Sequence, residues 1–150
     1  MSLPRERFLQ PSAGERFLNQ LFGRLVGWGF GLSHNYLLEV TGRKTGRVYS
    51  TPVNILDYKG KRFLVAPRGE TQWVRNARAG GQVWLKKGRT RDAYKIRSLS
   101  DAEKPELLKE YLDRFKTTVQ RYFDVPAGSP VEAFSTVAEN YPVFELTQTK

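Results

Sequence analysis

The sequence predicts an α+β fold built around a small antiparallel β-barrel. Six short segments carry strand signals, and several of the links between them are turns too short to hold a crossover helix. Parallel strand pairs need a long connection each time, so this spacing favours antiparallel pairing. The chain has 150 residues, 39% of them apolar, which is enough to bury one sizeable core. We expect a single domain over residues 1–150.

The first predicted element is an amphipathic helix over about residues 14–27. Apolar side chains recur there at helical spacing, at Phe17, Leu18, Leu21, Phe22 and Leu25. Several glycines weaken the end of this helix, because each costs ~1 kcal/mol relative to alanine. Trp28 and Phe30 follow in a flexible stretch. Packing on the core is the preferred interpretation of these aromatics, and contact with a membrane surface is the alternative.

Two predicted strands, 36–41 and 48–57, flank a basic turn. Residues 41–47 read Thr-Gly-Arg-Lys-Thr-Gly-Arg. The glycines let the backbone bend and approach a ligand closely, while Arg43 and Lys44 offer a forked donor and a point charge that suit phosphate. This pattern is typical of an anion-binding turn, and a solvated hairpin tip is the alternative. Pro52 cannot donate a ladder hydrogen bond, which predicts an edge or a bulge in the second strand.

The remaining strands are predicted at 62–66, 83–86, 90–99 and 141–147. Thr71 can cap a short helix that runs to residue 79 and is stopped by Gly80 and Gly81. A long helix opens at Ser100 or Asp101, and a further helical segment is predicted at 131–139. The long helix carries one apolar stripe, which we interpret as core, formed by Leu108, Tyr111, Leu112, Phe115, Val119 and Tyr122.

Positive charge is concentrated in one stretch of the chain. Residues 41–97 hold fifteen Lys or Arg against three acids, a net charge of +12, whereas the rest has ten cations and twelve acids, a net of −2. Such asymmetry argues for an acidic partner: nucleic acid, an anionic membrane surface or a polyanionic small molecule.

Other features exclude several classes of site. The chain has no cysteine, so disulfides, thiolate metal sites and a cysteine nucleophile are ruled out, and a cytoplasmic location is allowed. No metal-binding motif is present, and no metal site is predicted. The start resembles no signal peptide. The longest uncharged run, 25–38, is too short and polar to span a bilayer. We expect a cytoplasmic protein, with attachment to a membrane surface as the alternative.

Five motifs together carry a family resemblance. They are Tyr-Leu-Leu-Glu-Val-Thr-Gly-Arg-Lys-Thr-Gly-Arg from residue 36, Thr-Pro-Val from 51, Phe-Leu-Val-Ala-Pro-Arg-Gly from 63, Trp-Val-Arg-Asn from 73 and Tyr-Pro-Val-Phe-Glu-Leu from 141. From about residue 15 to the C-terminus the chain resembles the deazaflavin-dependent nitroreductase family. These proteins are split β-barrels, distantly related to flavin-dependent pyridoxamine phosphate oxidases. The resemblance implies a six-stranded antiparallel, FMN-binding-like split barrel with flanking helices.

The resemblance also implies a cofactor and a reaction. The cofactor is coenzyme F-420, a deazaflavin with a phosphodiester and an oligoglutamate tail, and the reaction is hydride transfer to an electron-poor small molecule such as a quinone, nitroaromatic or activated alkene. This polyanion would account for the basic stretch. The implied cofactor-binding residues are Arg43, Lys44, Thr45 and Arg47 at the phosphate, Ala66, Pro67, Arg68 and Gly69 beside the ring, and Trp73 and Asn76 at the pocket.

Parts of the family pattern do not transfer. Better-known members carry a longer Ser-Lys-Gly-Gly loop where this chain has Pro67 to Glu70, so substrate identity stays open. No catalytic residue is assigned, although family members place tyrosines near the substrate, which makes Tyr111, Tyr122 and Tyr141 candidates. Burial on the inner face of its helix is an equal alternative to a pocket role for Trp73. A turn residue is the alternative interpretation of Asn76.

Three other functions stay open. An FMN-dependent enzyme on the same barrel would explain the basic turn but not the breadth of the charge. A carrier would bind the deazaflavin or a lipid without turnover. A nucleic-acid binder ranks last, because aromatics such as Trp84 and Tyr94 are equally barrel core and such a binder does not require the glycine-bracketed turn. We therefore expect no nucleic-acid partner, and the oligomeric state is unassigned.

Overall fold

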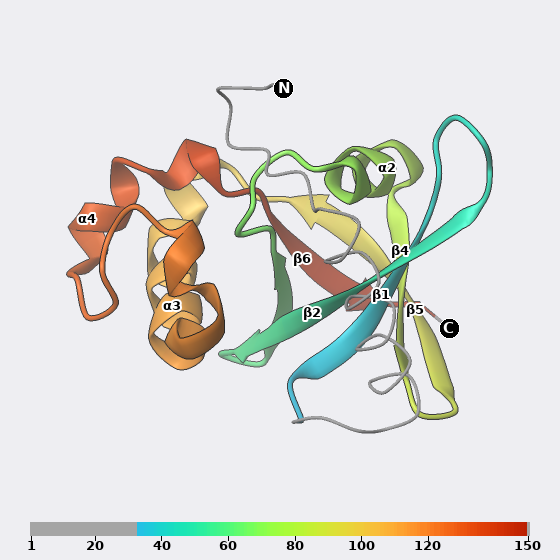
Figure 1. The fold of residues 1–150 in the computed structure, drawn as a ribbon, viewed down its shortest axis with the longest axis horizontal. Coiled ribbons are helices and arrows are strands. Elements are labelled where there is room, and N and C mark those ends of the chain that lie inside the picture. Colours follow the sequence, from blue (N-terminus) through green and yellow to red (C-terminus); the bar gives the residue numbers. More distant parts are fainter. Residues whose placement is uncertain (1–32, 150) are drawn as a thin grey trace.

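The computed structural model describes residues 33–149. The predicted N-terminal helix over residues 14–27, with Trp28 and Phe30, lies outside this range. Within it, the structure confirms the predicted α+β fold built on a six-stranded antiparallel barrel (Figure 1). The strands are β1 (Asn35–Thr41), β2 (Val48–Tyr58), β3 (Lys61–Val65), β4 (Gln82–Lys87), β5 (Thr90–Ser98) and β6 (Val143–Gln148). Their order around the closed barrel is β1-β2-β3-β6-β5-β4.

The β1–β2 hairpin extends beyond the closed part of the barrel. Its strands pair from Asn35 with Asn54 to Thr41 with Val48, whereas β2 pairs with β3 only from Ile55 onward. Pro52 therefore has β1 on one side and no paired strand from residues 33–149 on the other, which is the edge position that its missing N–H predicts. The hairpin tip with the basic turn projects beside helix α2 (Figure 1).

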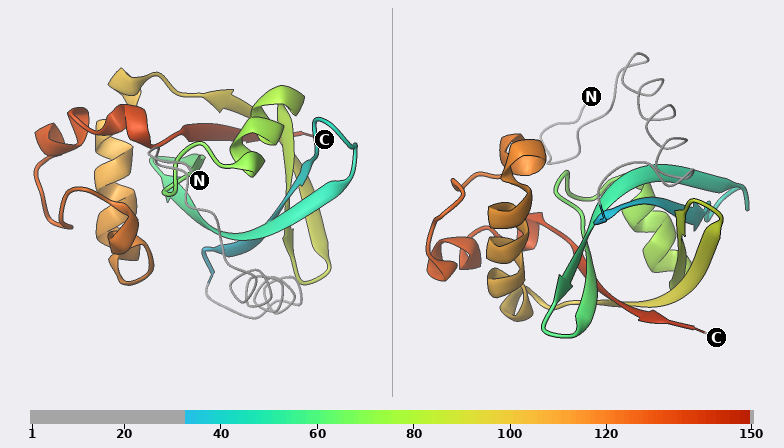
Figure 2. Two further views of the ribbon diagram at one scale, coloured as in Figure 1. Left: turned by 45° about the horizontal axis from the view of Figure 1, so that its top comes forward. Right: turned by 90° about the horizontal axis from the view of Figure 1, so that it is seen from below.

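Helix α2 (Gln72–Gly80) lies across one opening of the barrel (Figure 2). Val74 and Ala77 are fully buried in the barrel-interior core, next to side chains such as Leu38 and Phe144. Thr71 occupies the N-cap position but makes no capping bond through its side chain. The helix ends at Gly81, whose left-handed φ of 73° is the conformation that glycine adopts most easily. This packing fixes one face of α2 at the rim of the barrel.

A second core lies between the outside of the barrel and the C-terminal helices. Leu56 of β2 and Phe63 of β3 pack there against α3 (Pro105–Val119), on the stripe that includes Leu108 and Leu112. The predicted long helix is interrupted. A 3-10 turn, η1 (Asp101–Glu103), precedes Pro105, and φ of −115° at Phe115 marks a kink before the 3-10 turn η2 (Gln120–Tyr122).

The C-terminal elements are shorter than predicted. Helix α4 covers Val131–Ser135 and is followed by a separate 3-10 turn, η3 (Ala138–Asn140). Strand β6 begins at Val143. Tyr141 precedes it and packs in the second core, where its ring stacks on Phe123 at 4.4 Å and its hydroxyl donates to the carbonyl of Tyr122.

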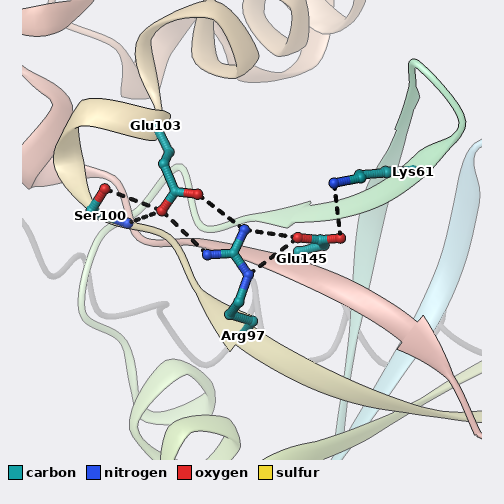
Figure 3. Close-up of polar contacts among 5 residues, drawn as sticks. All are labelled: Lys61, Arg97, Ser100, Glu103 and Glu145. Atoms are coloured by element: carbon teal, nitrogen blue, oxygen red, sulfur yellow. Dashed lines mark hydrogen bonds and ion pairs between the residues drawn. The ribbon is translucent and has the colours of Figure 1, made fainter.

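One charged network links the barrel to η1 (Figure 3). The Arg97 guanidinium lies 3.0 Å from Glu103 and 2.8 Å from Glu145, and Lys61 lies 3.7 Å from Glu145. Arg97 and the backbone N–H of Ser100 lower the pKa of Glu103 to about 2. The network joins β3, β5 and β6 to the start of the helical layer, and it uses two of the cations in the basic stretch.

No helix among residues 33–149 is both long and apolar enough to cross a bilayer. The same residues contain no group of three or more histidines and carboxylates arranged to hold a metal ion.

Candidate functional site

A pocket of about 300 Å³ lies between the β1–β2 turn and α2. Three residues of the predicted site line it from the turn, and two line it from the helix. The full lining is Gly42, Arg43, Lys44, Thr45, Tyr49, Gln72, Trp73 and Asn76. Segments about thirty residues apart in the sequence thus form one cavity with a cationic rim and two aromatic side chains.

The turn is closed by its own hydrogen bonds. The N–H of Gly42 donates to the carbonyl of Arg47 at 2.7 Å, and that of Gly46 donates to the carbonyl of Gly42 at 2.9 Å. Gly46 has a φ of 76°, a left-handed conformation that a residue with a Cβ adopts only with strain. The Thr45 hydroxyl accepts the N–H of Arg47 at 3.2 Å. The backbone of the turn is therefore fixed without a ligand.

Gly42 is required by close packing as well. A Cβ at this position would lie 2.6 Å from Cε2 of Tyr49 and 3.0 Å from the Thr45 hydroxyl. The ring of Tyr49 lies against the Gly42 backbone, and its hydroxyl is 3.3 Å from that of Thr45. Tyr49 is 45% exposed, so it forms a wall of the pocket and not part of the core.

Arg43 and the two other cations of the turn differ in their surroundings. The Arg43 guanidinium donates from Nη1 to Asn76 at 2.7 Å and to Gln72 at 3.1 Å. The side chains of Lys44 and Arg47 are exposed and make no hydrogen bond or ion pair with any residue that the structure describes. Within the turn, and among the residues described, these two cationic side chains are without a partner and are free for an anion.

Trp73 has both of the roles that the sequence left open. It is partly buried, packs against the barrel-interior core and places its ring 6.3 Å from that of Phe144. It also lines the pocket together with Asn76, three residues later on the same helix face. Asn76 is not a turn residue, since it lies in the middle of α2 and is only 7% exposed.

The predicted ring-side residues form the link from β3 to α2 and do not line this pocket. Ala66 is buried, and its N–H donates to the carbonyl of Pro142 at 2.9 Å. Gly69 turns the chain with a φ of 87° and bonds back to Ala66 at 3.1 Å. Pro67 and Arg68 lie between them, partly exposed.

Two buried polar atoms near this link lack a partner among the residues described. They are Nε of Arg68 and the hydroxyl of Thr71, a residue that is 8% exposed. A buried polar group without a hydrogen bond is costly, and such groups are uncommon in folded proteins. The Thr71 hydroxyl lies at the N-terminal end of α2, where backbone N–H groups and the helix dipole favour an acceptor or an anion, and Arg68 precedes it in the link from β3.

These observations fit a ligand of the implied kind. Unpaired cations at the turn suit a phosphodiester or carboxylates, and the aromatic walls suit a planar ring. Orphaned donors at the start of α2 suit a ring bearing carbonyl acceptors. The residues present therefore fit coenzyme F-420, although the pocket alone is too small to enclose the whole molecule.

Sequence reasoning missed three lining residues and one orphaned hydroxyl. Gln72 could have been found, because it lies one helical turn before Asn76. Tyr49 and Gly42 become neighbours only when the hairpin forms, and the Thr71 hydroxyl was interpreted as a helix cap.

The candidate tyrosines of the C-terminal half do not reach this pocket. Tyr111 is buried in the core around α3, and this burial raises its pKa. The hydroxyl of Tyr141 is held between the N–H of Asp124 and the carbonyl of Tyr122. Neither Tyr111 nor Tyr141 is placed as a hydroxyl over the pocket.

The basic stretch does not form one surface. At least six of its fifteen cations are in ion pairs, several of them with acids from outside the stretch: Lys59, Lys61, Arg62, Arg78, Arg91 and Arg97. The β4–β5 turn with Arg89 lies at the opposite end of the barrel from the β1–β2 turn (Figure 1). The free charge at the pocket is therefore local.

Comparison with known families gives one match over most of the chain. The family described as F420H(2)-dependent quinone reductase matches residues 16–126. Comparison with curated protein sequences finds no match.

Solved structures share the fold at low sequence identity. The protein Atu2129 of unknown function from Agrobacterium tumefaciens is 17% identical with a TM-score of 0.59; the alignment covers 95% of this chain and 58% of that one. An F420-H2 dependent reductase, FDR-A, is 20% identical with a TM-score of 0.52, covering 79% and 100%. A FAD-binding protein from Mesorhizobium loti is 12% identical with a TM-score of 0.50, covering 87% and 89%.

Proposed function

Because the chain belongs to the F420H(2)-dependent quinone reductase family, we propose that it reduces a small electron-poor acceptor of the quinone type at the pocket between the β1–β2 turn and α2. The family is one of oxidoreductases that use coenzyme F-420. The observation that carries the proposal is the pocket itself, which has the unpaired Lys44 on its rim and aromatic walls from Tyr49 and Trp73. Arg47 lies in the same turn outside the lining, and the two orphaned buried atoms lie in the adjoining link to α2.

We assign the anionic end of the cofactor to the turn. Lys44 and Arg47 supply positive charge, and Thr45, between them in the sequence, supplies a hydroxyl. The backbone hydrogen bonds of the turn already fix its shape. Each charge-assisted bond of this kind contributes ~1.5–3 kcal/mol, less where the pair is exposed to water. The turn would bind a phosphodiester or the first carboxylates of the tail.

We assign the ring end to the α2 side of the site. Trp73 packs against the barrel-interior core and lines the pocket. Arg68, Gly69 and Thr71 border the start of the helix, where the orphaned donors lie. When bound, reduced coenzyme F-420 supplies the hydride. The protein's contribution is to hold ring and acceptor in register and to limit the access of water.

Other expectations stay proposals: a single domain over residues 1–150, a cytoplasmic location, and contact of the N-terminal segment with a membrane surface. The basic hairpin and the apolar pattern of residues 14–27 support the last of these.

The direct test is turnover. The purified chain, given reduced coenzyme F-420 and menadione, is expected to oxidise the coenzyme at a rate proportional to protein concentration. A nitroaromatic and an enone, tested in parallel, rank the acceptor classes. Binding of the coenzyme without oxidation by any of the three acceptors would contradict the enzyme and support a carrier.

A further inference from the structure

Arg43 is held by α2, in contrast to its neighbours in the turn. Its backbone N–H donates to Oδ1 of Asn76 at 3.1 Å, and its Nη1 donates to the same oxygen at 2.7 Å. Nη1 also donates to Oε1 of Gln72 at 3.1 Å. Three hydrogen bonds thus join one residue of the hairpin to two residues of the helix.

The identity of the acceptor atom follows from chemistry. A backbone N–H and a guanidinium only donate, so the amide atom between them must be the oxygen of Asn76. That oxygen has two lone pairs, and the two Arg43 donors use both. Asn76 is 7% exposed and sits in a helix that is packed into the barrel. The acceptor is therefore fixed, whereas the hairpin tip that it holds is otherwise exposed.

We propose that Arg43 is a positioning residue, which docks the β1–β2 turn on α2 through its Nη1 bonds to Asn76 and Gln72, while the unpaired side chains of Lys44 and Arg47 supply charge for the anion. We call these three hydrogen-bonded residues the Arg43 clasp. The identity of the anion rests on the proposed function; the clasp itself does not. Without the clasp, the turn would keep its internal hydrogen bonds but would no longer be held at a fixed distance from Trp73. That distance sets the spacing between the anion-binding end and the ring end of the ligand site.

The clasp is tested first on the ligand-free protein. Amide hydrogen exchange of Arg43 reports its bond to Asn76 directly. Asn76→Ala is expected to remove the protection of this amide while the Gly46 amide, which bonds within the turn, changes less. Asn76→Asp keeps an acceptor oxygen at the same place and should retain the protection. Alanine is a better helix former than asparagine, so a loss of protection is not caused by a lower helix propensity at this position.

The second arm measures binding of coenzyme F-420. Arg43→Ala and Asn76→Ala are each expected to weaken binding roughly tenfold, and the double variant should lose less than the sum of the two effects, because both changes remove the same bond between Nη1 of Arg43 and Oδ1 of Asn76. Lys44→Ala combined with Asn76→Ala should instead be additive. Asn76→Ala removes no charge, so the dependence of affinity on salt should match that of the wild type, while Lys44→Ala should reduce it.

The exchange and binding measurements test the clasp and the proposed function separately. Unchanged exchange at Arg43 in Asn76→Ala, or additive effects of Arg43→Ala and Asn76→Ala on binding, would overturn the clasp. If the wild type does not bind coenzyme F-420, the proposed function fails, and the exchange data alone decide whether the clasp exists.

Discussion

Replacing Trp73 with alanine is expected to slow acceptor reduction about 100-fold, because a misplacement of ~1 Å at a reacting centre costs about that much. The indole both packs on the barrel core and lines the pocket, so its loss removes a rigid wall at the ring end of the site. The anion-binding turn is untouched. Binding of coenzyme F-420 should therefore weaken by less than tenfold, about 1.4 kcal/mol. Stopped-flow rates and equilibrium titrations measure the two effects independently.

Trp84 offers a matched control. It is also partly buried, but it lies on β4 with the Arg91 guanidinium 4.7 Å from its ring, outside the pocket. Trp84→Ala removes a similar apolar area and should leave the rate near that of the wild type when both variants are assayed below their melting temperatures. Equal losses of rate in the two variants would mean that Trp73 acts only through stability.

The double variant Lys44→Ala/Arg47→Ala is expected to weaken binding of coenzyme F-420 about 100-fold, roughly tenfold or 1.4 kcal/mol for each lost charge-assisted contact. Its melting temperature should stay close to that of the wild type. Both side chains are exposed and unpaired within the described part of the chain, and surface substitutions of this kind change stability by ~0.5 kcal/mol or less.

A second double variant separates local contacts from net charge. Lys86→Ala/Arg89→Ala removes the same charge near the β4–β5 turn, at the other end of the barrel. If this control weakens binding as much as the change at Lys44 and Arg47, the protein attracts the coenzyme by its overall field and the turn has no special role.

Local patterns predicted most of the fold. Strand signals bounded by turn residues located all six strands to within one or two residues, and each strand places part of its length on the barrel core. The ends of the helices were less predictable. Pro105 starts α3 where a continuous helix had been expected from residue 100 or 101, and the kink at Phe115 has no local signal in the sequence.

The site was predictable in its parts but not in its connections. The glycine-bracketed cations indicated an anion-binding turn, and the spacing of Trp73 and Asn76 placed both on one face of α2. The bonds from Arg43 to Asn76 span 33 positions in the sequence, and they exist only because β1 and α2 meet at the rim of the barrel. No periodicity or composition argument contains that information.

The charge excess along the sequence indicated an acidic partner but not where free charge would lie on the surface. Folding brings Glu39 to Arg91, and Glu103 and Glu145 to Arg97. Counting charges along the sequence misses these pairs, because the acids come from other strands or from the helical layer. What remains at the turn is the pair of unpaired cations Lys44 and Arg47, which suits a compact anionic group such as a phosphodiester.

The central claim, that this chain carries a deazaflavin site at the β1–β2 turn, is tested most directly by equilibrium binding of coenzyme F-420 and FMN to the purified protein at low and physiological salt. We predict tighter binding of coenzyme F-420, with an affinity that falls as salt rises, since exposed charge pairs are screened over ~8 Å at physiological ionic strength. Tight binding of FMN that does not depend on salt, together with no binding of coenzyme F-420, would contradict the claim.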